Sequence, residues 1–231
     1  MQLVKTNKIY LVCGIFLLTL NSCTTTNYNN SKTAQLPQSC VNSCTTPYGT
    51  ILGSNNGVIG YSNCNTSCIS NQENQTGDLY SGMPWQCVEY SRRWLQHAKG
   101  VTFGDVDSAY NIWDLQMVSS VTNKSVNYQF KSIPNGGIIA PKSGDLIIYA
   151  YEKKDFPYGH VGVIVNVNPT EGYADIAEQN YTNDYWENPN CYTRRIILKV
   201  HKKHYTLIDR DYNKNLHISI NGKILGWKHV Q

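Results

Sequence analysis

The segment Trp85-Gln86-Cys87-Val88-Glu89-Tyr90-Ser91-Arg92-Arg93-Trp94 decides how the rest of the chain is interpreted. Its apolar residues have the i, i+3, i+4, i+7, i+8 spacing of a half-buried helix that begins near Cys87. The predicted buried face consists of Cys87, Tyr90, Ser91, Trp94 and Leu95. Arg92 and Arg93 fall outside this stripe, so we expect them to be solvated charges.

Cys87 would lie in the first turn of this helix. There it meets unpaired amide N–H groups and the positive end of the helix dipole, and both favour a thiolate over a thiol. A nucleophilic cysteine needs this environment. The alternative is a small, inert core residue, which is a common role for a cysteine. The rest of the chain must decide between the two.

Length and composition favour one globular domain with an appended segment. The chain has 231 residues, of which 16% are charged and 11% aromatic. Its formal net charge is +4, and without Lys5 and Lys8 two positive charges are lost, leaving +2. This balance is too weak to indicate nucleic acid or an acidic membrane surface as a partner.

The N-terminus has the pattern of an export signal. Lys5 and Lys8 precede an apolar run over residues 9–20 that is short for a membrane span. Leu20-Asn21-Ser22-Cys23 resembles a bacterial lipobox, which predicts a signal peptide over 1–22 and lipidation of Cys23. An uncleaved anchor is the alternative and leaves the protein in the same compartment.

The residues after Cys23 extend this prediction. Thr24 is not the Asp that usually retains lipoproteins at the inner membrane, so we expect an outer-membrane lipoprotein that faces the periplasm. Residues 23–45 are rich in Thr, Asn, Ser and Gln, without apolar periodicity. They are predicted to be a flexible tether, and the domain is predicted to span 46–231.

The cysteines fit an oxidising compartment. Two pairs have the spacing Cys-x3-Cys, and we expect two disulfides among Cys40, Cys44, Cys64 and Cys68, with three pairings open. A zinc site made of the same four residues is the competing interpretation. Cys191 has no nearby partner and is interpreted as structural or free.

Helical patterns come first along the domain, and strand patterns follow. A second helix is expected over residues 107–113, with Asp107 as its N-cap. Apolar runs predict strands at 145–151, 160–167, 172–180 and 195–200, and Asn221-Gly222 is a hairpin turn signal. This order indicates an α+β fold in which N-terminal helices pack on an antiparallel sheet.

Strand alternation brings two further polar residues toward the Cys87 helix. Residues 166–171 are short enough to join the second and third of these strands as a hairpin, which would place His160 near Glu178. His160 could take the thiol proton, and Glu178 could fix the imidazole tautomer. The Cys87 backbone N–H, with the Gln86 side chain, could stabilise an oxyanion. An alternative is that Glu178 forms a structural ion pair with Arg92.

Five motifs in order resemble one family. They lie at 47–53, 85–93, 159–161, 176–180 and 224–227, so the resemblance covers most of the chain after residue 46. The chain resembles the amidase domain of glutathionylspermidine synthetase/amidase. That domain is a member of the CHAP group (cysteine-, histidine-dependent amidohydrolase/peptidase), which has a papain-like fold.

The resemblance implies roles for the site residues. Cys87 matches the nucleophile, His160 the base and Glu178 the orienting acid, while Arg92 and Asn180 match residues at the substrate cleft. The implied reaction is hydrolysis of an amide in a small thiol-polyamine conjugate, through a thioester and without a metal or cofactor. No ligase domain follows in this sequence, so synthesis is not expected.

Export leaves other functions open, because glutathionylspermidine is a cytoplasmic metabolite. The first alternative is a peptidoglycan amidase or endopeptidase that uses the same triad. The second is a catalytically silent binding domain tethered to the membrane. The third is transglutaminase-like acyl transfer to an amine, which uses the same acyl-enzyme.

Overall fold

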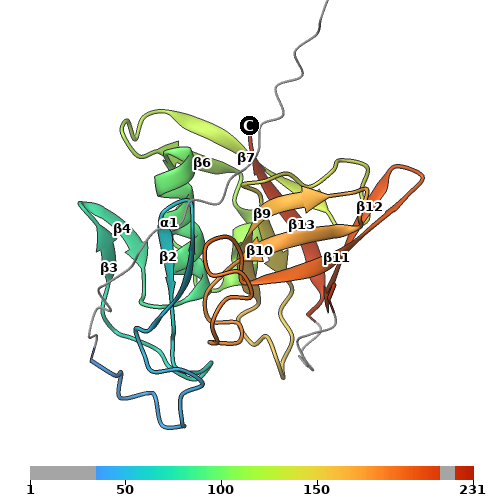
Figure 1. Ribbon diagram of the computed structural model, residues 1–231. Helices are drawn as coiled ribbons and strands as arrows, with labels where there is room; N and C mark the ends of the chain where they lie inside the picture. The colour runs from blue at the N-terminus through green and yellow to red at the C-terminus, as the bar shows by residue number, and fades with distance from the viewer. Residues whose placement is uncertain (1–34, 214–221) are drawn as a thin grey trace, which may run out of the picture.

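The computed structural model describes residues 35–213 and 222–231 (Figure 1). The predicted signal peptide, Cys23, the first part of the predicted tether and Asn221 of the predicted turn lie outside these residues. Within the described residues, no helix is both long and apolar enough to cross a membrane.

A nine-stranded sheet forms the body of the molecule, and all its strand pairings are antiparallel. Its strand order is β12-β11-β10-β9-β8-β13-β7-β6-β5. The strands are β5 (Val101–Thr102), β6 (Met117–Ser120), β7 (Asn127–Pro134), β8 (Leu146–Tyr149), β9 (His160–Asn168), β10 (Tyr173–Ala177), β11 (Arg194–His201), β12 (His204–Asp211) and β13 (Ile224–Val230). The predicted antiparallel sheet is therefore confirmed, and β5, β6, β7 and β12 are additions to the predicted strands.

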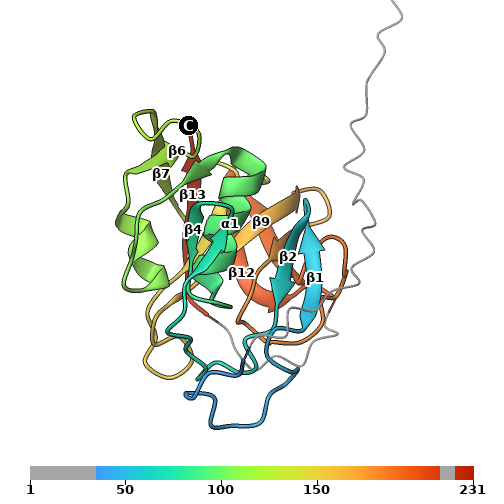
Figure 2. The ribbon, with the colours of Figure 1, turned by 90° about the vertical axis from the view of Figure 1, so that its left-hand side faces the viewer.

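Two small hairpins lie on the other side of the molecule from β11 and β12, as Figure 1 shows. They pair β1 (Ile51–Asn55) with β2 (Val58–Tyr61) and β3 (Asn74–Thr76) with β4 (Leu79–Gly82). Both hairpins lie beside the helix α1 (Cys87–Lys99), as the turned view in Figure 2 also shows.

The helix α1 begins at Cys87, as predicted, and ends before Gly100, whose φ of 65° lies in the left-handed region that glycine tolerates. The second predicted helix is a short 3-10 helix, η1 (Ala109–Asp114), preceded by Ser108 and not capped by Asp107. Packing of several helices on the sheet is not confirmed, because α1 and η1 are the helices of the described residues. Six residues are too few to stabilise an α-helix alone.

The predicted apolar face of α1 packs against the sheet. Tyr90, Trp94 and Leu95 share one core cluster with Val161 and Val163 of β9. Burying side chains of this size stabilises the fold by about 1.5–3 kcal/mol each. A second cluster contains residues of β8, β9, β10, β11 and β13. The core thus fixes the N-terminus of α1 beside the start of β9.

The prediction that Arg92 and Arg93 are solvated is wrong. Arg92 is 2% exposed and Arg93 is 8% exposed. The two small hairpins cover this side of α1, and their backbone supplies acceptors: Ser81 O for Arg92 and Ile59 O for Arg93. The helical periodicity of a sequence does not indicate that segments distant in the chain will bury the polar side of the helix.

The described cysteines form the predicted disulfides, in one of the three possible pairings. Cys40 is bonded to Cys68, and Cys44 is bonded to Cys64. Their sulfurs are therefore not thiolates available to zinc, which removes the competing interpretation. Cys191, interpreted from the sequence as structural or free, is also disulfide-bonded. Among the described residues, Cys87 is the cysteine that keeps its thiol.

Candidate active site

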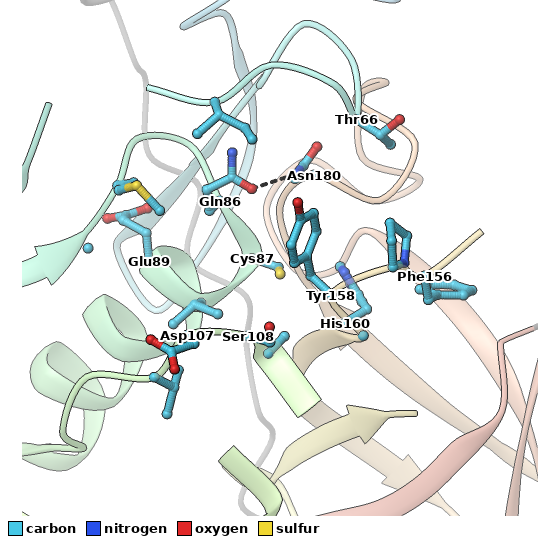
Figure 3. Close-up of a pocket in the computed structure, with 18 of the residues that line it drawn as sticks. Thr66, Gln86, Cys87, Glu89, Asp107, Ser108, Phe156, Tyr158, His160 and Asn180 are labelled. Atoms are coloured by element: carbon cyan, nitrogen blue, oxygen red, sulfur yellow. Dashed lines mark hydrogen bonds between the residues drawn. The ribbon is translucent and has the colours of Figure 1, made fainter. Parts of the chain in front are cut away.

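A cleft of about 350 Å³ lies over the N-terminus of α1 and the start of β9 (Figure 3). One wall contains Gln86 and Cys87 from the helix side, and the other contains His160 and Tyr158 from the sheet side. Thr66 and Ile69 come from the disulfide-bearing segment and also line the cleft. The cleft is large enough for a small molecule or a peptide segment.

Cys87 is the first residue of α1 and is 9% exposed at the base of this cleft. Gln86 is the N-cap residue but makes no side-chain cap hydrogen bond. The amide N–H groups of the first turn therefore point toward the thiol end of the helix without a capping side chain. This arrangement stabilises negative charge at the sulfur and at an oxygen bound beside it.

His160 joins the two walls of the cleft. Its Nε2 lies 2.8 Å from Glu178 Oε2, and both His160 and Cys87 line the same cleft. Figure 3 shows the imidazole directed toward the Cys87 sulfur. Burial lowers the pKa of His160, but the charge and hydrogen bonds of Cys87 and Glu178 outweigh it and raise that pKa to about 9.

Glu178 follows β10 and is 1% exposed. Burial raises its pKa, but the Arg194 guanidinium and the hydrogen bond with His160 outweigh burial and lower that pKa to about 2. Arg194 Nε lies 2.5 Å from Glu178 Oε1. The predicted alternative partner, Arg92, is therefore wrong, since Arg194 occupies that position.

The register of β9 and β10 explains how His160 and Glu178 meet. Ala177 pairs with Val163, so Glu178 continues alongside Gly162. A Cβ atom at Gly162 would lie 3.0 Å from Glu178 Oε2 and 2.8 Å from Ile176 Cγ2. The glycine thus leaves the space in which the carboxylate reaches His160.

Gln86 and Asn180 form a chain of amide hydrogen bonds. Asn180 Nδ2 donates to Gln86 Oε1 at 2.8 Å, and Gln86 Nε2 donates to Cys68 O at 2.9 Å. Asn183 Nδ2 donates to Asn180 Oδ1 at 3.2 Å. These bonds fix the Gln86 amide from both ends, and one of its two N–H groups stays available.

Arg92 lines the cleft but donates mainly to its own protein. Its guanidinium donates to Phe103 O, Ser81 O and Gly104 O, and it forms an ion pair with Asp105 at 3.1 Å. A direct substrate contact by Arg92 therefore stays a prediction. The same holds for Asn180, whose side-chain partners are Gln86 and Asn183.

Sequence analysis missed Arg194. The signal that could have found it is the alternation of β11, in which Arg194, Ile196 and Leu198 share a buried face. An arginine on the apolar face of a strand needs a buried acceptor. Glu178 was already predicted as a buried carboxylate that needs a partner. It would then have been the first candidate acceptor for Arg194.

Comparison with known proteins identifies a family and two relatives. Residues 78–180 match the CHAP domain family. The chain is 32% identical over 171 residues to the bifunctional glutathionylspermidine synthetase/amidase of Escherichia coli (strain K12), covering 71% of this chain and 27% of that protein. It is 32% identical over 164 residues to trypanothione synthetase of Crithidia fasciculata, covering 71% of this chain and 24% of that protein. The chain thus spans about a quarter of the length of these relatives.

Proposed function

Because residues 78–180 of this chain carry a CHAP domain, we propose that the protein is a cysteine-dependent amidohydrolase. The single observation that carries this proposal is the position of His160, whose ring bonds Glu178 and faces Cys87 in one cleft. His160 thus lies between the nucleophile and the orienting acid, which is the arrangement that covalent acyl transfer requires.

The first half of the proposed reaction forms a thioester. With its pKa near 9, His160 is an imidazolium at neutral pH. In the proposed reaction Cys87 attacks as a thiolate, which the helix N-terminus and the nearby imidazolium favour. The sulfur attacks the amide carbonyl, and the oxyanion is stabilised by the Cys87 backbone N–H and the remaining Gln86 N–H. His160 then gives its proton to the leaving nitrogen, the C–N bond breaks, and a neutral amine departs.

The second half restores the enzyme. Neutral His160 takes a proton from water as the water oxygen attacks the thioester carbonyl. The C–S bond breaks, the carboxylic acid product leaves, and Cys87 returns as a thiolate beside the imidazolium. Glu178 stays ionised throughout and keeps the imidazole in one orientation.

We propose a glutathionylspermidine-like substrate, a small thiol-polyamine conjugate. Two relatives carry this chemistry in their names, and the cleft suits a cationic amine. Asp107 and Asp155 line it with Lys154, whereas Arg92 is already neutralised by Asp105. A polyamine leaving group would be attracted to these two carboxylates.

The test uses the full chain and its Cys87→Ala variant. Each is incubated with glutathionylspermidine, and released spermidine is measured by mass spectrometry. We expect release by the wild-type protein only, with a loss of at least about 10⁴-fold in the variant. Equal release by both proteins would contradict a cysteine mechanism.

A second candidate is a peptidoglycan amidase or endopeptidase with the same residues. The observation that favours it is the pair of disulfides, which fits an exported protein. We accordingly propose export to the bacterial cell envelope, as a lipoprotein anchored through Cys23. Incubation with purified sacculi is the discriminating measurement: Cys87-dependent release of wall peptides would replace the polyamine conjugate as substrate.

A further inference from the structure

Four neighbouring strands each place one charged residue in a continuous buried network behind Cys87. His160 begins β9, Glu178 follows β10, Arg194 begins β11 and Asp209 lies on β12. These strands lie side by side in the sheet (Figure 1). All four residues are at most 3% exposed. We call them the charge network.

Arg194 is the centre of this network. Its Nε donates to Glu178 Oε1, and its NH1 nitrogen donates to Asp209 Oδ1, both at 2.5 Å. Its NH2 nitrogen donates to the Tyr149 hydroxyl at 2.8 Å, and the guanidinium lies 3.8 Å from the ring centre of Tyr181. Each nitrogen of the planar guanidinium therefore donates to a buried acceptor.

The two oxygens of Glu178 have separate main partners. Oε1 accepts from Arg194, whereas Oε2 lies 2.8 Å from His160 Nε2. A buried carboxylate without a cation takes up a proton, since burial penalises its charged form. A neutral Glu178 could no longer stabilise an imidazolium, and its oxygens could exchange places.

We propose that Arg194 is a positioning residue of the reaction: it keeps the Glu178 carboxylate charged and turned toward His160, while Asp209 holds Arg194 in place. This inference rests on the proposed function, because it assumes that Cys87 and His160 act together. Arg194 does not line the cleft among the described residues, so it acts through Glu178 and not on a substrate.

The groups around Glu178 make the direction of the effect clear. His160 of β9 and Arg194 of β11 carry positive charge, Asp209 of β12 carries negative charge, and the phenols of Tyr149 and Tyr181 are neutral. Cys87 of α1 faces the other side of His160. Without Arg194, one of the two cations beside Glu178 is gone, and its pKa must rise.

The chain offers a matched control in the next residue. Arg195 also lies on β11 and also forms an ion pair and a ring contact, with Asp175 at 2.6 Å and with the Tyr173 ring at 3.7 Å. Neither partner contacts the charge network. Arg195→Gln therefore removes the same kind of interaction from the same strand without touching Glu178.

The experiment compares Arg194→Gln, Arg194→Lys and Arg195→Gln with the wild-type protein. Two rates are measured from pH 3 to pH 10. One is the rate of glutathionylspermidine hydrolysis, and the other is the rate at which iodoacetamide alkylates Cys87. For Arg194→Gln we expect kcat to fall about 10- to 100-fold with little change in KM. The acid limb of both profiles should move up by about 1–3 pH units. Arg194→Lys should show a smaller fall in kcat and a smaller shift of the acid limb than Arg194→Gln. Arg195→Gln should have the kcat and the pH profiles of the wild-type protein.

Wild-type profiles for Arg194→Gln would overturn the inference, and so would equal shifts for Arg195→Gln. If Arg194→Gln does not fold, Arg194→Lys must shift the acid limb in the same direction by a smaller amount, and a wild-type profile for Arg194→Lys would overturn the inference. The alkylation rate needs no amide substrate. A wrong substrate therefore leaves the shift of the alkylation profile intact, whereas a wrong role for Arg194 abolishes it.

Discussion

The two walls of the cleft are held by different forces. The sheet wall presents His160 through a buried network of full charges, in which Glu178 and Arg194 are each at most 3% exposed. The helix wall presents Gln86 through neutral amides, and its last acceptor is the carbonyl of Cys68, a disulfide-bonded residue. One wall depends on ionisation and the other on a covalent crosslink.

This difference separates the two variables to which the site should respond. Buried ion pairs fail when one partner loses its charge, because the remaining charge is left unsolvated. Neutral amide hydrogen bonds do not titrate, so the bonds that hold the Gln86 side chain do not change with pH over a wide range. These bonds should respond instead to reduction of the Cys40–Cys68 disulfide, because reduction frees the segment that carries Cys68.

The largest expected effect comes from removing charge in the sheet wall. Glu178→Gln should lower kcat roughly 1000-fold or more, because the imidazole loses both its orientation and the partner of its charge. It also removes a cause of the raised pKa of His160, so the alkaline limb of activity, near pH 9 in wild type, should move to lower pH. The profile of kcat/KM against pH measures both.

The opposite sign would break the comparison. An unchanged or raised alkaline limb in Glu178→Gln would mean that Glu178 does not raise the pKa of His160. The sheet wall would then be a scaffold without an electrostatic part in the chemistry.

An intermediate effect is expected from cutting the crosslink of the helix wall. Replacing both Cys40 and Cys68 with Ser should lower kcat/KM about 10- to 100-fold, because the Cys68 carbonyl no longer fixes Gln86. The pH at which activity is half-maximal should stay where it is. Steady-state kinetics across pH distinguishes this pattern from that of Glu178→Gln.

The second disulfide provides the control for this prediction. The two crosslinks span sequence separations of 28 and 20 residues, so each contributes a similar stability, about 3 kcal/mol. Replacing Cys44 and Cys64 with Ser should therefore cost similar stability with a smaller loss of activity. Equal losses of activity would show that the helix wall needs general stability and not the position of Cys68.

The smallest expected effect concerns the charged pair on the helix wall. Asp105, the partner of Arg92, has a side chain that is 77% exposed. Exposed ion pairs contribute less than about 1 kcal/mol, so Asp105→Asn should barely change the unfolding midpoint in urea. Arg92 keeps three backbone acceptors in the variant. A decrease of the unfolding free energy by more than about 1 kcal/mol would show that the Arg92–Asp105 pair stabilises the helix wall as a charge network does.

The helix wall and the sheet wall also differ in how far the sequence could predict them. Local periodicity was enough to start α1 at Cys87 and to pair β9 with β10, because both depend on residues close in the chain. The proximity of His160 and Glu178 follows from that hairpin. The catalytic roles themselves stay predictions until the kinetics above are measured.

Features that depend on distant segments were missed or wrong. Arg92 and Arg93 were predicted as solvated because no local pattern reports that two hairpins cover their side of α1. Arg194 was missed because it reaches Glu178 only after β11 pairs with β10, across the loop that separates these strands. The segment around η1 was predicted as an α-helix, but Tyr110 N instead donates to Tyr158 O across the cleft.

The pairing of Cys40 with Cys68 has a consequence for the chemical surroundings in which the protein can work. Nucleophilic attack needs Cys87 as a thiolate, whereas the helix wall beside it needs the disulfide between Cys40 and Cys68. Strong reductants keep Cys87 reduced but also reduce the Cys40–Cys68 disulfide. Oxidants preserve the disulfide but oxidise Cys87. Activity should therefore peak at an intermediate thiol–disulfide poise, so that the cleft reports the redox state of its compartment.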